Sequence, residues 1–201
     1  MPMHVAVAVS GRGSNLEALL RVLGPDTPAR VVLVLSTRPD APALKHAAAK
    51  RIPSLVLQDP AGSAEWLEAL ERHAVDLVVL AGYVKLVPSD VIARYRGRII
   101  NIHPALLPSF GGKGMYGRRV HEAVLASGAR ESGATVHLVD EVYDRGAILG
   151  QARVPVLPGD DPDRLAARVL EIEHQLLPAA VLAAAAAGRP VPIHEPVESH
   201  Q

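Results

Sequence analysis

The sequence predicts an α/β protein with a doubly wound, mostly parallel, Rossmann-like sheet of about seven strands and helices on both faces. Short runs rich in Val, Leu and Ile alternate with amphipathic segments along most of the 201 residues. The first runs lack a strict polar–apolar alternation, which is typical of parallel strands whose two faces are both covered. Because strand and helix patterns repeat in turn, the β-α-β order favours one sheet wrapped by helices.

The predicted strands are short segments in which Val, Leu and Ile dominate. Their expected ranges are His4–Val9, Arg30–Ser36, Ser54–Leu57, Asp76–Ala81, Arg98–His103, Ala134–Val139 and Ile148–Val156. The first five have the composition of parallel strands that are buried on both faces of a sheet.

Amphipathic helices are predicted in the gaps between the strands. The first has one apolar face with i, i+3, i+4, i+7 spacing, formed by Leu16, Leu19, Leu20 and Leu23. Gly24 follows at the C′ position, which glycine favours because it tolerates the backbone conformation there.

Two more helices are predicted in the first half of the chain. Pro39-Asp40 has the composition of a helix start. Ser63 precedes an apolar stripe formed by Trp66, Leu67 and Leu70.

The last predicted helix carries the strongest N-terminal signal. Asp161 stands at the N-cap position, Pro162 at the first helical position and Asp163 in the first turn. One apolar stripe follows, formed by Leu165, Val169, Ile172 and Leu176.

The composition favours one domain that spans residues 1–201, with a C-terminal tail after about residue 188. Apolar residues make up 49% of the chain, so general disorder is excluded. Lys plus Arg equals Asp plus Glu at 21 each, and a nucleic-acid partner is not expected without a basic surplus. Small-molecule substrates are expected instead, and the sequence leaves monomer and homodimer open.

The sequence predicts a cytoplasmic protein without a membrane partner. It contains no cysteine, so it has no disulfide framework or thiolate zinc site and is compatible with a reducing compartment. The first residues lack the basic region of a signal peptide. The alanine-rich run at 179–187 is too short to span a bilayer.

A glycine-rich turn at Gly11–Asn15 is the first candidate site. It joins the first strand to the first helix, where free N–H groups favour an anion and glycine allows close approach. A dinucleotide fingerprint is incomplete, because Leu16 replaces its third glycine and no acid ends the second strand. Because a Walker loop is also missing, a single phosphomonoester fits best. A tight turn without a ligand remains the alternative.

Asn101 and His103 form the second candidate site. Two residues apart on a strand that Pro104 ends, their side chains point to the same side. An amide can hold a developing oxyanion while an imidazole moves a proton, which suits acyl transfer. Asp144 lies in an acidic connection before the last strand, and its charge beside His103 would raise the pKa of the imidazole. A structural histidine and a solvated acidic loop remain the alternatives.

Two further histidines near this region do not form a recognisable metal site. His121 and His137 could join His103 and Asp144, but their spacing matches no metal-ligand motif. The sequence therefore predicts no metal. It interprets His121 as an exposed helix residue and His137 as a strand residue that lines the pocket.

Several motifs carry a family resemblance: SGRGSN, LAGYVKLVP, RIINIHPALLPSF, ATVHLVDEVYDRGAIL and RVLEIEH. In this order, over residues 5 to about 180, they resemble the glycinamide ribonucleotide formyltransferases, a folate-dependent family of purine synthesis. NIHPALLP followed by the D-x-G turn is specific for formyl-tetrahydrofolate transferases in general. SGRGSN with Glu173-His174 narrows the resemblance to the ribonucleotide members.

The resemblance implies a formyltransferase fold and formyl transfer from 10-formyltetrahydrofolate, as co-substrate, to the glycine amine of phosphoribosylglycinamide. It implies no metal. The catalytic residues would be Asn101, His103 and Asp144. The phosphate and ribose of the ribonucleotide would be bound by Gly11, Arg12, Gly13, Ser14, Asn15, Lys113, Leu170, Glu171, Ile172 and Glu173. Folate would be bound by Val84, Lys85, Leu86, Val87, Asn101, Asp140, Glu141, Val142, Tyr143 and Asp144.

The chain also departs from the family pattern. The segment between His103 and His121 is long and glycine-rich, which suggests a mobile lid, and Lys85 stands where the family has an arginine. A formyltetrahydrofolate hydrolase would use a similar trio behind an added amino-terminal domain. A methionyl-tRNA formyltransferase would add a carboxy-terminal RNA-binding domain. A non-catalytic folate- or nucleotide-binding module is the remaining alternative.

Overall fold

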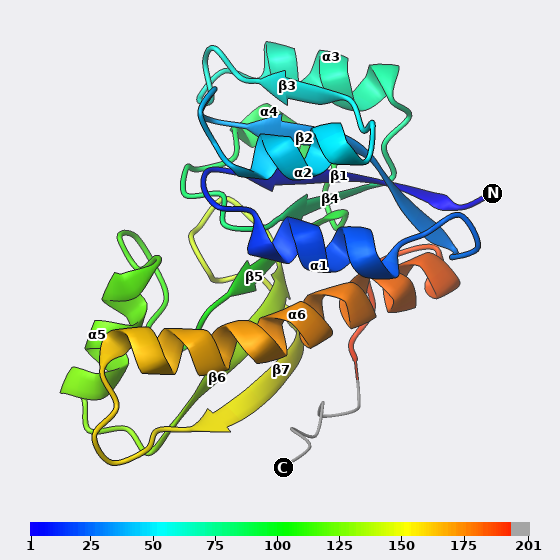
Figure 1. The fold of residues 1–201 in the computed structure, drawn as a ribbon. Coiled ribbons are helices and arrows are strands. Elements are labelled where there is room, and N and C mark those ends of the chain that lie inside the picture. The colour runs from blue at the N-terminus through cyan, green and yellow to red at the C-terminus, as the bar shows by residue number, and fades with distance from the viewer. Residues whose placement is uncertain (194–201) are drawn as a thin grey trace.

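The described residues form a seven-stranded sheet with the strand order β3-β2-β1-β4-β5-β6-β7 (Figure 1). This computed structural model describes residues 1–193, so residues 194–201 of the expected tail lie outside the described part. The strands are β1 Met3–Val9, β2 Ala29–Ser36, β3 Ser54–Val56, β4 Leu77–Leu80, β5 Ile99–His103, β6 Glu131–Leu138 and β7 Ile148–Pro155. Every predicted strand is present, with its ends within three residues of the predicted range.

The sheet is parallel in its first five strands and antiparallel in its last two. Parallel pairs join β3 to β2, β2 to β1, β1 to β4 and β4 to β5. The strand β6 runs antiparallel to both β5 and β7. The predicted mostly parallel, doubly wound sheet is confirmed. Because parallel strands end at the same edge, the carboxyl ends of β1, β4 and β5 meet there.

The helices of residues 1–193 are α1 Ser14–Val22, α2 Ala43–Ala49, α3 Ala64–Arg72, α4 Ser89–Arg94, α5 Arg118–Ala126 and α6 Pro162–Ala187. The helix predicted after β2 is present, but α2 begins at Ala43, three residues after the predicted start at Pro39-Asp40. Before it, Arg38 and Asp40 form an ion pair of 2.6 Å across a turn. Helix α4 was not predicted, since six residues are too few for a clear apolar stripe.

Alternate residues of β1 face two different cores. Val5, Val7 and Val9 lie in one core with apolar side chains of α1, α2 and α6. Ala6 and Ala8 lie in the other, with side chains of α3 and α4. Helices therefore cover both faces of the sheet, as the ribbon shows (Figure 1).

Helix α6 crosses the antiparallel half of the sheet (Figure 1). The Asp161 carboxylate caps it by accepting hydrogen bonds from the N–H groups of Asp163 and Arg164, as the sequence predicted. By length and composition alone α6 could cross a membrane, but half of its most apolar window is buried inside the protein. It contacts α1, α5, β6 and β7, which is the position of a core helix.

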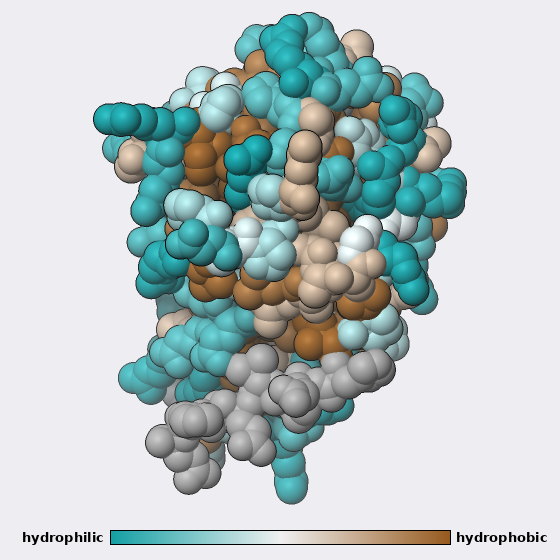
Figure 2. All heavy atoms as spheres, turned by 90° about the vertical axis from the view of Figure 1, so that its right-hand side faces the viewer, coloured by the Kyte–Doolittle hydropathy of each residue, from teal (hydrophilic) through white to brown (hydrophobic). Residues whose placement is uncertain are grey.

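Residues 189–193 lead from the end of α6 back to β7. The Ile193 N–H donates to the Leu149 carbonyl at 2.6 Å, and the Ile193 side chain lies against Gly150. Figure 2 shows the end of the molecule where the chain begins and α6 ends. Hydrophilic side chains surround smaller hydrophobic areas on this face. The carboxyl end of β1 lies on the opposite side of the molecule (Figure 1).

The cap of α6 can be tested by Asp161→Ala. This change removes both hydrogen bonds from the first turn and is expected to lower the free energy of unfolding by about 1 kcal/mol. Urea denaturation measures the loss. Asp161→Ser keeps a capping oxygen and is the control, so an equal loss in both variants would contradict the capping role.

Candidate active site

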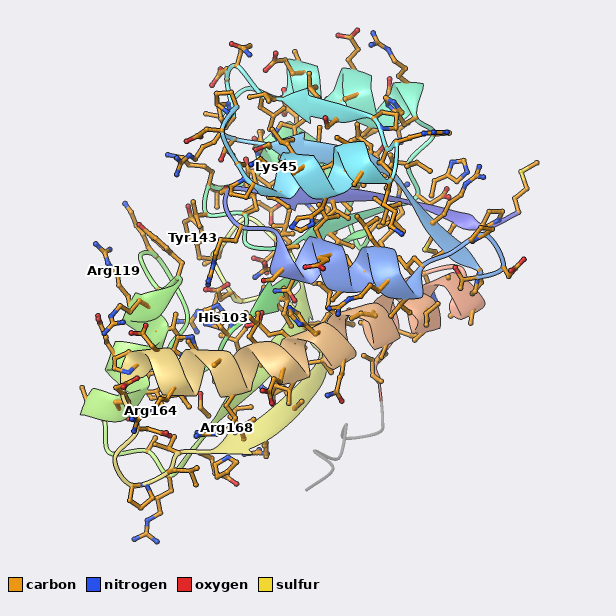
Figure 3. The ribbon with its side chains drawn as sticks, in the orientation of Figure 1. Lys45, His103, Arg119, Tyr143, Arg164 and Arg168 are labelled. Atoms are coloured by element: carbon orange, nitrogen blue, oxygen red, sulfur yellow. The ribbon has the colours of Figure 1, made fainter. Side chains whose placement is uncertain are left out.

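A pocket of about 1030 Å³ opens where the parallel strands end. Its walls come from the β1–α1 turn, the segment after β4, the end of β5, the loop before α5, the β6–β7 connection and the first half of α6. Figure 3 labels His103 and Tyr143, which line this pocket from the end of β5 and from the β6–β7 connection. Segments far apart in the sequence therefore meet at one edge of the sheet, as ligand sites do in open α/β folds.

The β1–α1 turn presents backbone to this pocket. Gly13 is the N-cap of α1 with a φ of 82°, and an added Cβ would lie 2.5 Å from the Ala43 side chain. Only glycine fits there without strain. Ser14 is the first residue of the helix rather than its cap. The residues of this turn line the pocket, and the free N–H groups at a helix start suit an anion.

Asn15 and Glu173 join α1 to α6 inside the pocket. The Asn15 amide donates to the Glu173 carboxylate over 2.6 Å. Glu173 is only 7% exposed, and burial raises the pKa of its carboxyl group to about 7, although the bond from Asn15 opposes the rise. The Asn15 Oδ1 atom is buried and has no partner among residues 1–193. This buried oxygen could therefore accept a hydrogen bond from a ligand.

Asn101, His103 and Asp144 converge, as the sequence predicted. Asn101 pairs with His137 across β5 and β6, and its Nδ2 lies 3.0 Å from His137 Nε2. The Leu138 carbonyl accepts from His137 Nδ1 at 2.7 Å, so Nε2 is the ring atom that faces the Asn101 amide. This contact orients the Asn101 amide and leaves its second N–H for a ligand.

His103 is almost fully buried between two protein acceptors. Its Nε2 lies 2.8 Å from the Phe110 carbonyl, and its Nδ1 lies 3.7 Å from Asp144 Oδ2. Burial lowers the pKa of the imidazole, although Asp144 and the Phe110 carbonyl act to raise it. The prediction of a raised pKa is therefore wrong. The charge of Asp144 acts in the expected direction, but desolvation outweighs it.

Asp144 is held from several sides. Its Oδ2 accepts from the Gly112 N–H at 2.8 Å, and its Oδ1 lies 3.5 Å from His137 Nε2. Burial acts to raise the pKa of this carboxyl, yet the interactions with His137, His103 and Gly112 lower it below the usual value. Asp144 is therefore an anion at neutral pH, placed to support a charged imidazole.

Most of the other predicted site residues line the same pocket, Lys113 and Leu170 included. Three do not line its wall in the part of the chain that the structure describes: Glu141, Glu171 and Ile172. Glu141 points to solvent and pairs with Arg96 at 2.8 Å. On α6, Ile172 faces the core and Glu171 faces solvent, because one helix turn can present only some neighbours of Glu173 to the pocket.

Several pocket residues were not predicted, or were predicted differently. His121 lines the pocket and is 5% exposed, rather than an exposed helix residue, and burial lowers its pKa. Its place beside the buried Val120 and Val124 on α5 was the available signal. Arg118 and Asp163 pair across the rim, which only the tertiary fold brings together. Within residues 1–193, no group of three or more His, Asp or Glu side chains is placed to hold a metal.

A buried amide, imidazole and carboxylate at the end of a parallel sheet define a site suited to acyl transfer. The chain belongs to the formyl transferase family, whose model matches residues 3–181.

Within this family, the chain is similar to proteins named phosphoribosylglycinamide formyltransferase. The chain is 44% identical to the chloroplastic phosphoribosylglycinamide formyltransferase of Arabidopsis thaliana over 180 residues, which are 86% of this chain and 62% of that protein. It is 42% identical to the phosphoribosylglycinamide formyltransferase of Mycobacterium tuberculosis, over 93% of this chain and 87% of that protein. It thus spans less than two thirds of the plant relative and most of the bacterial one.

A solved structure is also similar. The phosphoribosylglycinamide formyltransferase of Anaplasma phagocytophilum matches with a TM-score of 0.86 and 36% sequence identity, over 92% of this chain and 88% of that one.

The protonation of His103 is open to direct measurement. We expect an NMR titration of its ring protons to give a pKa below the usual 6.5 in the free protein, because burial dominates. Asp144→Asn should lower this pKa further, since the variant loses the charge that favours imidazolium. Asp26→Asn is the charge-matched control and should leave the pKa of His103 unchanged. A higher pKa in Asp144→Asn would contradict the electrostatic role.

Ionisation of the Glu173 carboxyl group should lower the free energy of unfolding at high pH. Its pKa is higher in the folded chain than the ordinary 4.5, so its stabilising protonation is complete at pH 4 and is lost as the pH rises through 7. Glu173→Gln stays neutral and keeps an oxygen for Asn15. We expect its free energy of unfolding at pH 8 to exceed that of wild type by an amount on the order of 3 kcal/mol. At pH 4 the two should nearly coincide, and calorimetry that shows a constant difference would exclude this titration.

Proposed function

We propose that this chain transfers the formyl group of 10-formyltetrahydrofolate to the glycine amine of 5-phosphoribosylglycinamide, in de novo purine (IMP) biosynthesis. The products are the N-formyl ribonucleotide and tetrahydrofolate. The observation that carries the proposal is one pocket in which an anion-receptive turn, Gly11–Asn15, lies opposite the side chains of Asn101, His103 and Asp144. The names of the similar proteins support the same reaction.

The ribonucleotide would bind along the α1–α6 side of the pocket. Its phosphate would lie at the β1–α1 turn, whose backbone N–H groups suit an anion, and two cations, Arg12 and Lys113, line the same pocket. Neither cation is paired with a carboxylate within residues 1–193. Glu173 of α6, which accepts a hydrogen bond from Asn15 of α1, would bind the ribose hydroxyls or the amine-bearing end of the ribonucleotide.

Folate would bind on the opposite wall, between the segment after β4 and the β6–β7 connection. Val84, Leu86 and Val142 line the pocket and are 40%, 46% and 58% exposed, an unusual exposure for aliphatic side chains. They offer an apolar surface to a ring system. The backbone of these loops would supply its hydrogen bonds.

The reaction begins when the neutral amine attacks the formyl carbon and negative charge develops on the carbonyl oxygen. The free N–H of Asn101 stabilises this oxyanion. His103, neutral in the resting site, takes the proton that the attacking nitrogen loses, and Asp144 stabilises the imidazolium. His103 then passes the proton to N10 of the folate as the C–N bond breaks. No metal or redox cofactor is needed in these steps.

The proposal includes the biological setting expected from the sequence. The chain would act as a single domain on small molecules in the cytoplasm, with 10-formyltetrahydrofolate as its only co-substrate. Neither a nucleic acid nor a membrane would take part. Size measurement in solution would decide between monomer and homodimer.

The test is formyl transfer by the purified chain, followed through folate absorbance with and without phosphoribosylglycinamide. The proposed function requires acceptor-dependent turnover and a formylated product by mass spectrometry. Folate deformylation without the acceptor would instead establish a hydrolase. Binding of both ligands without any turnover would establish a non-catalytic module.

Substitution of the catalytic groups should separate chemistry from binding. Loss of an oxyanion donor costs roughly 2.7–4 kcal/mol, so Asn101→Ala should lower kcat about 100- to 1000-fold with little change in ligand affinity. His103→Ala should reduce turnover at least as strongly. His73→Ala, outside the pocket, is the control and should keep wild-type kinetics. Near-normal kcat in His103→Ala would refute the mechanism.

A further inference from the structure

Ser10 lies directly between the two walls of the pocket without lining either. It follows the last residue of β1 and precedes Gly11 of the anion-receptive turn, and its side chain is nearly buried at 8% exposure. It lies behind the pocket wall that the described residues form. Whatever Ser10 contributes to a reaction must therefore act through its neighbours.

One set of contacts joins Ser10 to the folate-facing wall. The Ser10 N–H donates to the Gly82 carbonyl at 3.1 Å, and the Ser10 hydroxyl oxygen accepts from the Val84 N–H at 3.3 Å. Gly82 has a φ of 75°, so the chain bends sharply between these two bonds. Ser10 thus holds both ends of the bend that presents Val84 to the pocket.

The Ser10 hydroxyl oxygen also has a second donor. The Thr37 hydroxyl, just beyond β2, donates to the Ser10 oxygen at 2.9 Å. The next residue is tied down separately, because the Gly11 carbonyl accepts from the Ala43 N–H at 3.3 Å. The Ser10 oxygen therefore accepts two hydrogen bonds at a fixed point of the sheet edge. An alanine there could accept neither, and the Val84 N–H would lose its partner.

We propose that Ser10 is a positioning residue that fixes the folate-facing bend Gly82–Val84 relative to the ribonucleotide-facing turn Gly11–Asn15. This inference rests on the proposed function for the identity of the two ligands. Formyl transfer requires its two reactants at a near-attack distance, so the spacing of the two walls is itself a catalytic requirement. The hydroxyl oxygen of Ser10 is the atom that sets this spacing on the folate side.

The experiment compares four full-length chains: wild type, Ser10→Ala, Ser10→Thr and Thr37→Val. Ser10→Thr keeps the hydroxyl. Thr37→Val is the matched control, because it removes one donor to Ser10 but leaves the contact with Val84. Two readouts are taken: the KM for 10-formyltetrahydrofolate at saturating ribonucleotide, and the hydrogen-exchange rate of the Val84 amide by NMR without ligands.

Ser10→Ala should raise the KM for the folate donor about fivefold and speed exchange at Val84 by a similar factor, as the loss of one hydrogen bond implies. Affinity for the ribonucleotide alone should stay within twofold, because the Gly11 turn keeps its own bonds. Ser10→Thr should restore both values, and Thr37→Val should change neither more than twofold. A purely structural role would lower the unfolding temperature without this pattern.

Two results would overturn the inference: Ser10→Ala with both values within twofold of wild type, or an equal effect of Thr37→Val. If Ser10→Ala does not fold, Ser10→Cys, whose sulfur is a weak acceptor, is held to the same criterion. An inactive wild-type chain would refute the proposed function instead. The exchange rate at Val84 would then still decide whether Ser10 holds the bend.

Discussion

The antiparallel pairing of β5 with β6 is the constraint on which the site depends. It reverses the chain direction beside the strand that ends in Asn101 and His103, and it sets His137 opposite Asn101. The strand β6 therefore ends beside the first residues of β5, and the β6–β7 connection that follows returns Asp144 to within 3.7 Å of His103. A sixth parallel strand would have required a crossover connection here, so His137 would not follow directly in the strand that pairs with Asn101.

Close backbone approach then fixes Asp144. An added Cβ on Gly146 would lie 1.8 Å from the Leu138 carbonyl oxygen, so only glycine allows the connection to turn so tightly. Asp144 itself adopts a φ of 56°, which is unusual for a residue with a side chain. On its other side, Gly111 leaves room that a Cβ would close, at 3.1 Å from the Asp144 Cβ. Strain of this kind is typical of functional sites, where surrounding contacts hold it in place.

Much of this arrangement could be predicted from local sequence, and the rest depends on distant contacts. The strands and α6 were predictable because apolar runs and the Asp161 cap are local signals. The fit of Glu173 to the pocket was predictable, but not the outward direction of its neighbour Glu171, which depends on how α6 is rotated against the sheet. The burial of His121 was not predicted either, because it depends on how α5 packs against the rest of the protein.

The protonation of His103 shows most clearly what sequence reasoning lacks. Proximity to a carboxylate can be inferred from a motif, but the cost of removing charge from water depends on the whole surrounding wall. That wall lowers the pKa of His103 and raises the pKa of Glu173 in one pocket, by the same desolvation. In the proposed reaction, the imidazole that burial keeps from being charged at rest receives the proton of the attacking amine. The oxyanion and the imidazolium form together in this proposed reaction. Their opposite charges stabilise each other in a buried site where either charge alone would be unfavourable. In the proposed reaction the imidazolium belongs to the intermediate, and Asp144, 3.7 Å from His103, is close enough to stabilise it.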